Sequence, residues 1–253
     1  MVWSSTAIPT TLTALPFCAP RPDPDMPPVT AARPGLPSHP PTTRAIYAAL
    51  RRDIVMLALM PGAKLSENEL SLRFGTSRGP VREALIRLGE DGLIEVLPQR
   101  GSFVGRLSLP AIERARFVRE ALEIAVVRRA AEKGLPAEAR IRAEASLSAQ
   151  GGEGVDAESF IALDDGFHAG FAEAIGLGEV WAVIEREKAQ FDRIRFLSLP
   201  AATPIDVIIA QHRSILRAVL DRDPAAGEVA VRDHMAEVLK IVDDLPGRYP
   251  HLF

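Results

Sequence analysis

The sequence predicts a mainly α-helical protein in which three short helices and a β-hairpin are followed by an antiparallel bundle of six helices. Three observations predict this architecture. Apolar residues recur at helical spacing through most of residues 42–246, two short apolar strands flank a turn that contains Pro and Gly, and Gly or Pro residues interrupt the C-terminal half at short intervals. Short connections between helices favour antiparallel neighbours, so the C-terminal half is expected to form a bundle.

The composition limits the class of protein. The chain has 253 residues, of which 47% are hydrophobic and 25% are charged. This apolar share suffices for a packed core and excludes disorder over the whole chain. The longest apolar run, residues 54–60, is far shorter than the ~20 residues that a bilayer span needs, so we expect no membrane partner. The single cysteine, Cys18, excludes a disulfide framework and fits a reducing compartment.

Residues 1–41 are predicted to be a disordered tail. They contain 11 of the 21 prolines, which lack the backbone N–H that helices and sheets require. An over-long start of the coding sequence is the alternative explanation. A secretory signal is disfavoured, because the first twenty residues contain no Lys or Arg and because Pro9 and Pro16 interrupt the apolar run.

Charge divides the remaining chain into two domains. Residues 42–106 carry 10 basic and 7 acidic residues, a net charge of +3, whereas residues 107–253 carry 18 basic and 24 acidic residues, a net charge of −6. A positive unit joined to a negative one indicates that only the first contacts a polyanion. We expect a helical domain over residues 107–246 and a C-terminal tail over residues 247–253.

The first unit has the pattern of a helix-turn-helix. Apolar spacing predicts a helix over residues 42–58, and Pro61-Gly62 follows it. The sequence Ser66-Glu67-Asn68-Glu69 is a capping box that begins a second helix ending at Gly75. Ser77 is the expected N-cap of a third helix that ends at Gly92. Two short helices joined by a turn with Gly form this motif.

The third helix has the faces of a recognition helix. Its apolar side is predicted to pack on the core, whereas Gly79 and Arg82 lie on the opposite side, with Arg78 and Arg87 on the flanks. Arg82 can pair with guanine in the major groove, and the flanking arginines can contact phosphates. Gly79 allows close approach of the backbone.

A β-hairpin wing is predicted next. Residues 94–97 and 102–104 form its strands, and Arg100 and Gly101 lie in its tip, where Arg100 is placed for phosphate or minor-groove contact. Taken singly, each of these arginines is better explained as a solvated surface charge. The helices and the basic hairpin in this order together favour binding to double-stranded DNA.

Polar residues interrupt the apolar faces of the bundle. The predicted helices span residues 110–133, 136–150, 155–175, 178–198, 204–221 and 224–244. Asp164 and His168 lie within the apolar stripe of the third of these, His212 within that of the fifth, and His234 within that of the sixth. Burying an unpaired carboxylate costs several kcal/mol. A divalent ion, with zinc or nickel preferred by imidazole, would satisfy all four groups. The alternative is an Asp–His hydrogen-bond network without metal.

The sequence resembles a known family at these motifs. Residues 63–104, which include Thr76-Ser77-Arg78-Gly79-Pro80-Val81-Arg82-Glu83-Ala84-Leu85, look like the winged helix of GntR-type bacterial transcription regulators. The C-terminal part looks like the FCD domain of the family's FadR-like branch. The motifs there are Arg119-Glu120-Ala121-Leu122-Glu123, Asp164-Asp165-Gly166-Phe167-His168, His212-Arg213-Ser214-Ile215-Leu216 and His234. Six helices resemble the shorter, VanR-like members of that branch.

The resemblance implies a function and a set of ligands. It implies a cytoplasmic, nucleoid-associated homodimer that binds a near-palindromic operator, with a metal held by the Asp–His group. It also implies a small organic acid effector beside that metal, with Arg119 reaching its carboxylate, although Glu123 at i+4 offers Arg119 an ordinary ion pair. Gly79 departs from the Thr common in the family. Gly176-Leu177-Gly178 departs from the Gly-Asn that many members have.

Two other functions stay open on the sequence alone. A site of three histidines and one aspartate with open positions could activate water, but no acid–base residue lies one turn from the ligands, and a DNA-binding unit has no evident use in a hydrolase. Alternatively, the metal is purely structural, and the helical domain serves only for dimerisation.

Overall fold

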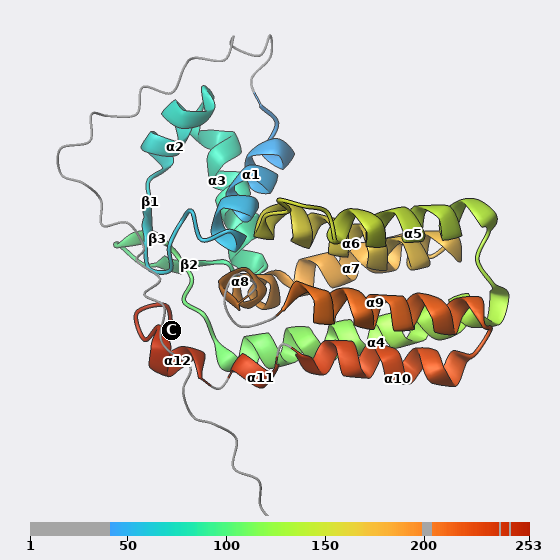
Figure 1. Cartoon of the computed structure of the whole chain (residues 1–253). Coiled ribbons are helices and arrows are strands. Elements are labelled where there is room, and N and C mark those ends of the chain that lie inside the picture. The colour runs from blue at the N-terminus through green and yellow to red at the C-terminus, as the bar shows by residue number, and fades with distance from the viewer. Residues whose placement is uncertain (1–40, 199–203, 238, 243) are drawn as a thin grey trace, which may run out of the picture. The chain divides into compact units, whose positions relative to one another are not determined.

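The computed structural model describes residues 41–198, 204–237, 239–242 and 244–253 (Figure 1). The predicted tail, residues 1–41, lies outside the described residues except for Pro41. The described chain is mainly helical with one small sheet, as the sequence predicts.

The N-terminal elements have the predicted order with one addition. They are α1 (Thr43–Val55), β1 (Lys64–Leu65), α2 (Glu67–Phe74), α3 (Arg78–Glu90), β2 (Ile94–Leu97) and β3 (Gly101–Val104). The hairpin β2–β3 is joined by β1, which pairs antiparallel with β3 and gives the strand order β1-β3-β2. The sequence does not predict β1, because two residues are too few to show an alternating pattern.

Local capping explains where these helices begin. The Ser66 side chain accepts a hydrogen bond from the Glu69 N–H (3.4 Å), and Gly75 ends α2 in the left-handed conformation with φ of 60°. Ser77 takes the N-cap position of α3 as predicted but makes no side-chain cap hydrogen bond. The first helix ends at Val55 rather than at residue 58, because the backbone at Leu57 has φ of 56° and leaves the helix.

The recognition helix has the predicted faces. In α3 the apolar side is buried in the core of the winged helix, and the opposite side is exposed. The buried residues are Val81, Ala84, Leu85 and Leu88. The four predicted DNA-facing positions on this helix are therefore open to solvent.

The C-terminal elements form the predicted antiparallel bundle with two corrections to the helix bounds. They are α4 (Leu109–Lys133), α5 (Ala137–Gln150), α6 (Ala157–Ala174), α7 (Gly178–Glu187), α8 (Ala189–Ser198), α9 (Ile205–Leu220), α10 (Pro224–Glu237), α11 (Leu239–Val242) and α12 (Leu245–Arg248). The helix predicted over residues 178–198 is broken at Lys188, and the one predicted over residues 224–244 ends at Glu237. The break contains neither Pro nor Gly, and Lys188 is buried there in ion pairs with Asp165 and Asp192.

Residues 247–253, for which the sequence predicts a tail, are packed on the chain that links the winged helix to the bundle. Leu252 is buried beside Leu107 and α8, and its carbonyl accepts a hydrogen bond from the Leu107 N–H (2.8 Å). The end of the described chain therefore helps to hold the linker.

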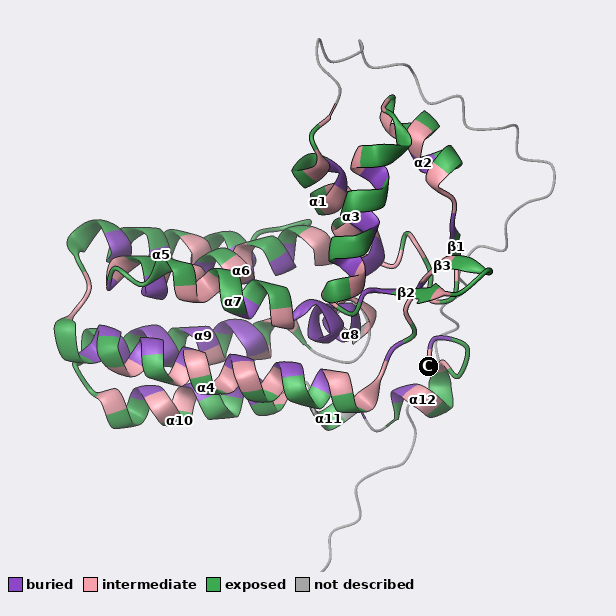
Figure 2. Ribbon diagram, turned by 180° about the vertical axis from the view of Figure 1, so that it is seen from behind, coloured by how far each residue is buried: buried purple, intermediate pink, exposed green. Residues whose placement is uncertain are grey.

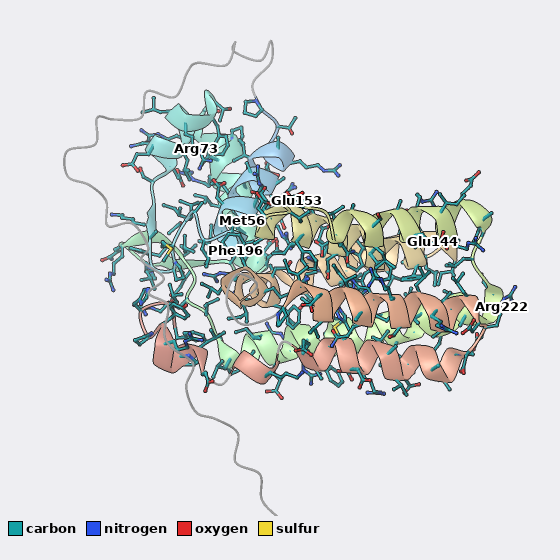
Figure 3. All side chains as sticks on the ribbon, in the orientation of Figure 1. Met56, Arg73, Glu144, Glu153, Phe196 and Arg222 are labelled. Atoms are coloured by element: carbon teal, nitrogen blue, oxygen red, sulfur yellow. The ribbon has the colours of Figure 1, made fainter. Side chains whose placement is uncertain are left out.

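Buried residues run along the inner faces of the bundle helices (Figure 2). The central cluster includes Val127 of α4, Phe167 of α6, Ile215 of α9 and Met235 of α10. At the bundle end remote from the wing, Arg222 donates from Nη1 to the Glu132 carbonyl (3.2 Å; Figure 3). Among the described helices, none combines the length with the hydropathy of a membrane-spanning segment.

Candidate metal centre and nucleic-acid interface

The four predicted metal ligands meet inside the bundle. Asp164 and His168 come from adjacent turns of α6, His212 comes from α9, and His234 comes from α10. All four are buried, and one potential ligand atom from each lies within 4.8 Å of the others. The apolar stripes that place these residues in the core thus bring together side chains up to 70 positions apart.

The imidazole Nε2 atoms point toward the shared centre. His168 Nε2 lies 3.2 Å from His212 Nε2, and His212 Nε2 lies 3.2 Å from Asp164 Oδ1. The rings of His168 and His234 stack with 5.0 Å between their centroids. Three nitrogen donors and a carboxylate oxygen therefore face one small volume.

Each imidazole meets an acceptor on its other nitrogen. His212 Nδ1 lies 2.8 Å from Gln150 Oε1, His234 Nδ1 lies 3.2 Å from Gln211 Oε1, and His168 Nδ1 lies 2.6 Å from Glu123 Oε2. An acceptor at Nδ1 fixes the proton there and leaves the Nε2 lone pair for a metal. Sequence reasoning missed Gln150 and Gln211, since nothing in the sequence around a glutamine marks it as an imidazole partner.

Two buried arginines adjoin the carboxylate. Arg195 Nη2 lies 2.7 Å from Asp164 Oδ1, and Arg119 Nη2 lies 3.5 Å from Asp164 Oδ2. Arg119 Nε also donates to Glu123 Oε1, the ion pair that the i, i+4 spacing predicts. Arg195 was not predicted, because its helix was expected to continue from α7 without a break.

Burial and charge set the protonation of the group. Burial lowers the pKa of His212 to about 4, although Asp164 opposes this shift. Burial and the two neighbouring imidazoles lower the pKa of His234 well below its usual value. Burial alone would raise the pKa of Asp164, but the charge of Arg195 outweighs it and holds the pKa well below normal. Neutral imidazoles and an ionised carboxylate are the forms that bind metal.

The donor set fits a transition metal. Three imidazole nitrogens and one carboxylate oxygen suit zinc, nickel and similar divalent ions, and the acceptors at Nδ1 supply the outer contacts that such sites have. The group could therefore hold a metal ion.

The predicted DNA contacts lie together on the winged helix. Arg78, Gly79 and Arg82 are exposed on α3, and Arg100 and Gly101 are exposed at the wing. Arg82 donates from Nε and Nη2 to the two carboxylate oxygens of Glu67, both at 2.9 Å. Its guanidinium is thereby held in one orientation by a residue that the sequence indicated only as part of a capping box.

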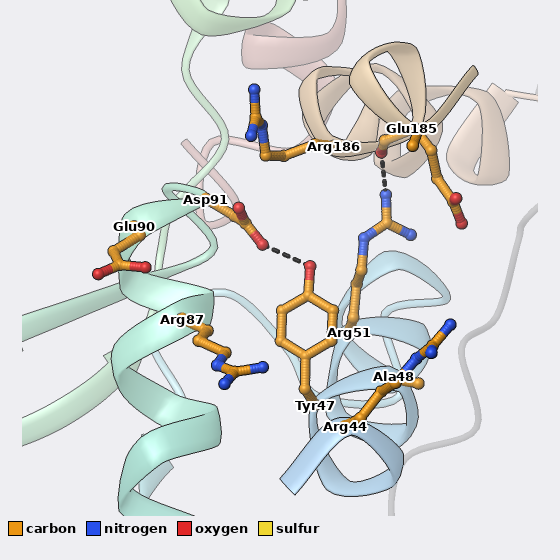
Figure 4. A pocket seen from close by; sticks show the side chains of 10 residues that line it. Arg44, Tyr47, Ala48, Arg51, Arg87, Glu90, Asp91, Glu185 and Arg186 are labelled. Carbon is orange, nitrogen blue, oxygen red and sulfur yellow. Dashed lines mark hydrogen bonds between the residues drawn. The ribbon is translucent and has the colours of Figure 1, made fainter. Parts of the chain in front are cut away.

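Arg87 lies farther along α3 and faces a pocket of about 540 Å³ between α1, α3 and α7 (Figure 4). Arg87 Nη2 donates to Glu83 Oε1 (2.6 Å). In the same pocket, the Tyr47 hydroxyl donates to Asp91 Oδ2 (2.5 Å). Burial and this hydrogen bond raise the pKa of Tyr47 to about 12. The residues that line the pocket are of mixed charge, and none of them belongs to the Asp–His group.

Comparisons with known proteins agree with this architecture. The model described as "Bacterial regulatory proteins, gntR family" matches residues 42–104, and the model described as "FCD domain" matches residues 115–237. The chain is 39% identical over 204 residues to the HTH-type transcriptional repressor RspR of Escherichia coli strain K12, covering 80% of this chain and 89% of that protein.

A second relative and a solved structure extend the comparison. The chain is 38% identical over 214 residues to the "Uncharacterized HTH-type transcriptional regulator in unstable DNA locus" of Streptomyces ambofaciens, covering 83% of this chain and 89% of that protein. The structure of E. coli McbR/YncC superposes with a TM-score of 0.68 at 22% identity, over 79% of this chain and 95% of that chain. This last likeness shows a shared fold.

Proposed function

The chain belongs to the gntR family of bacterial regulatory proteins and carries an FCD domain, so it is a transcriptional regulator, and we propose that it is a homodimeric repressor controlled by a small carboxylate. The observation that carries the proposal is the buried Asp–His group in a helical domain that follows a winged helix. Its relatives are regulators rather than enzymes, which removes the reason to propose hydrolytic chemistry at the site.

We propose that Asp164, His168, His212 and His234 hold one divalent ion, zinc or nickel, in each protomer. When bound, the ion supplies positive charge that stabilises the buried carboxylate and attracts an anionic effector. Glu123, Gln150 and Gln211 orient the three imidazoles for this role.

Arg119 is the proposed contact for the effector carboxylate. Its Nε is held by Glu123, whereas its buried Nη2 lies 3.5 Å from Asp164 Oδ2 without forming a hydrogen bond to a described residue. A buried donor of this kind gains a charge-assisted hydrogen bond when a carboxylate binds. Arrival of the effector would change the spacing of α6, α9 and α10, and thereby the affinity for operator DNA. A coupling of ~1–3 kcal/mol is enough for regulation.

The proposed DNA contacts follow from the exposed faces of α3 and the wing. Arg82, held by Glu67, is placed to recognise guanine, and Gly79 allows the backbone to approach the bases. Arg78, Arg87 and Arg100 would contact phosphates, and Gly101, the first residue of β3, follows the wing turn with φ of 105°.

Dimerisation is proposed through α4 and α7. Phe117 of α4 is 68% exposed, and it lies one turn before a groove of about 480 Å³ that includes Ala121, Ala125, Leu177 and Val180. Two copies related by a two-fold axis can each place Phe117 near the other's groove, which makes the contact self-complementary. Phe117→Asp is expected to give a monomer in size-exclusion chromatography with light scattering. Ile141→Asp, at a similarly exposed position on α5, is the matched control and should stay dimeric.

Selection from a random duplex library tests the DNA-binding proposal. The zinc-loaded protein should enrich a near-palindromic motif whose half-sites are separated by one helical turn. Arg82→Ala should lose the preference for guanine at one position in each half-site, whereas Arg140→Ala, on the exposed face of α5, should not. Failure of the wild type to enrich any motif would contradict operator binding.

A thermal-shift screen of organic acids, with and without chelator, tests the sensor. An effector that binds beside the metal stabilises the folded protein only in the absence of chelator. If some acids stabilise the protein and also change operator affinity, the domain is a sensor. If no carboxylate changes operator affinity although elemental analysis finds metal, the metal is structural only.

A further inference from the structure

We propose that α8 couples the buried metal-ligand group to the winged helix, with Gln190 and Arg193 as the positioning residues. The inference rests on the proposed function, because it needs an occupied site to influence DNA binding. Figure 1 shows α8 between the winged helix and the long bundle helices, and its side chains contact both.

On one side, α8 binds main-chain carbonyls of the winged helix. Gln190 Nε2 donates to the carbonyl of Gly92, in the turn between α3 and β2, at 3.0 Å. Arg193 Nη2 donates to the carbonyl of Gly105, in the linker between β3 and α4, at 2.9 Å. Ala189 is buried in the apolar core of the winged helix itself. The first turns of α8 therefore hold the recognition helix at its C-terminal end and the linker at its start.

On the other side, the same helix binds α6 at the metal-ligand group. Arg195 Nη2 lies 2.7 Å from Asp164 Oδ1, an oxygen of a proposed metal ligand. Lys188, at the break before α8, lies 2.7 Å from Asp165 Oδ2 and also pairs with Asp192. Arg195, which contacts Asp164, lies two residues after Arg193 in the same helix. A displacement of Asp164 is therefore transmitted to Arg193 through α8.

Burying the guanidinium of Arg193 costs the folded protein free energy, which indicates that this residue has a role other than stabilising the fold. Its side chain is fully buried, and its guanidinium donates to neutral oxygens rather than to a carboxylate. Its partners are the Gly105 carbonyl and Gln190 Oε1 (3.0 Å), and burial lowers its pKa to about 10. Apolar residues of similar volume often stabilise a core as well as a buried charge does, so the guanidinium is better explained by what it holds in place.

The two segments that α8 contacts, the linker at Gly105 and the turn at Gly92, are also hydrogen-bonded to each other. The Gly105 N–H donates to the Leu93 carbonyl (2.8 Å), and a Cβ at Gly105 would lie 3.3 Å from that same oxygen. Since the two segments are joined, displacement of α8 moves them together. The winged helix is then reoriented as a unit, which is the change that alters the spacing of two recognition helices in a dimer.

Hydrogen exchange on the full-length protein, in chelator and with zinc, tests the coupling. In the wild type, zinc should slow exchange near the ligands, in residues 160–172 and 208–216, and also in the winged helix, in residues 90–96 and 103–108. In Arg193→Met and in Gln190→Leu the slowing near the ligands should persist, whereas the slowing in the winged helix should fall by about tenfold or vanish. Arg140→Met, which breaks only an exposed ion pair with Glu144, is the control and should behave as the wild type.

The outcomes separate this inference from the proposed function. If both variants keep the zinc-dependent slowing in the winged helix, α8 is not the coupling element. If zinc does not slow hydrogen exchange near the ligands of the wild type and elemental analysis finds no zinc, the metal proposal is wrong. The proposed coupling is then wrong as well. If Arg193→Met fails to fold, Arg193 is required for the stability of the fold. Gln190→Leu, which leaves the guanidinium in place, then shows whether α8 couples zinc binding to the winged helix.

Discussion

The three histidines of the buried group differ in the acceptor at Nδ1, which is a carboxylate for His168 and an amide for His212 and His234. The charge of Arg119 outweighs the effect of burial and lowers the pKa of Glu123 to about 2, so this carboxylate is ionised at neutral pH. An ionised acceptor makes the imidazole a stronger donor to a metal. His168 is therefore expected to be the strongest nitrogen ligand.

Glu123→Gln tests this ranking. The amide keeps an acceptor for His168 Nδ1 but removes the charge, so the affinity for zinc should fall by about 10- to 100-fold. Competition with a chromophoric chelator measures the change. Glu120→Gln, three residues earlier on α4 and outside the group, should bind zinc like the wild type. Equal zinc affinity in Glu123→Gln would show that Glu123 serves only to pair Arg119.

Tyr47 predicts how stability responds to alkaline pH. The pKa of Tyr47 is raised from 10.0 to about 12, so the folded protein keeps the phenol proton where the unfolded chain loses it. Its contribution to stability is complete below pH 10 and is lost as the pH rises toward 12. The difference in Tm between the wild type and Tyr47→Phe should therefore shrink over this interval, as followed by circular dichroism. A difference that stays constant would contradict the Tyr47–Asp91 hydrogen bond.

At the scale of elements, Gly227 of α10 packs tightly against α4. A Cβ at this position would lie 2.9 Å from Val127 Cγ1, and a β-branched side chain has little freedom to move away. Gly227→Ala is expected to destabilise the protein by about 1–3 kcal/mol, because it forces α10 off the core.

A second glycine provides the control for that substitution. Gly170 lies inside α6, and a Cβ at this position would meet no atom of another described element within 4 Å. Gly170→Ala should raise stability by about 0.5–1 kcal/mol, because alanine is the better helix former. Urea unfolding of both variants measures the difference. Equal effects of the two substitutions would show that α10 can shift away from α4 without cost.

The sequence predicts most elements from the spacing of apolar residues, and it predicts the ligand group from the polar residues that interrupt this spacing. Asp164 and His212 stand out because they interrupt apolar stripes, and a buried polar residue needs a partner. The break at Lys188 has no such sign, since neither Pro nor Gly marks it and the ion-pair partners of Lys188 lie on α6 and α8. Arg193 is hidden for the same reason: on sequence alone it is an ordinary surface arginine.

At the scale of the whole molecule, binding to DNA should depend steeply on salt. If Arg78, Arg87 and Arg100 each contact a phosphate, a dimer makes about six such contacts, and the slope of log K against log salt should be about −5. Arg87→Ala should make this slope about 2 units shallower on every duplex, cognate or random, because phosphate contacts carry no sequence information. Fluorescence anisotropy between roughly 50 and 200 mM salt measures both. An unchanged slope would remove Arg87 from the interface and leave it to its pair with Glu83.

The order of the proposed metal ligands along the chain has a consequence for biosynthesis. Asp164 emerges from the ribosome first and His234 last, 70 residues later, so at ~5–20 residues per second the nascent chain spends roughly 4–14 s with an incomplete ligand set. If these four residues bind the ion, the complete site can form only after α10 has been synthesised and has docked. Cells short of the ion would accumulate a full-length apoprotein rather than a truncated intermediate, and that apoprotein would be the form exposed to proteolysis.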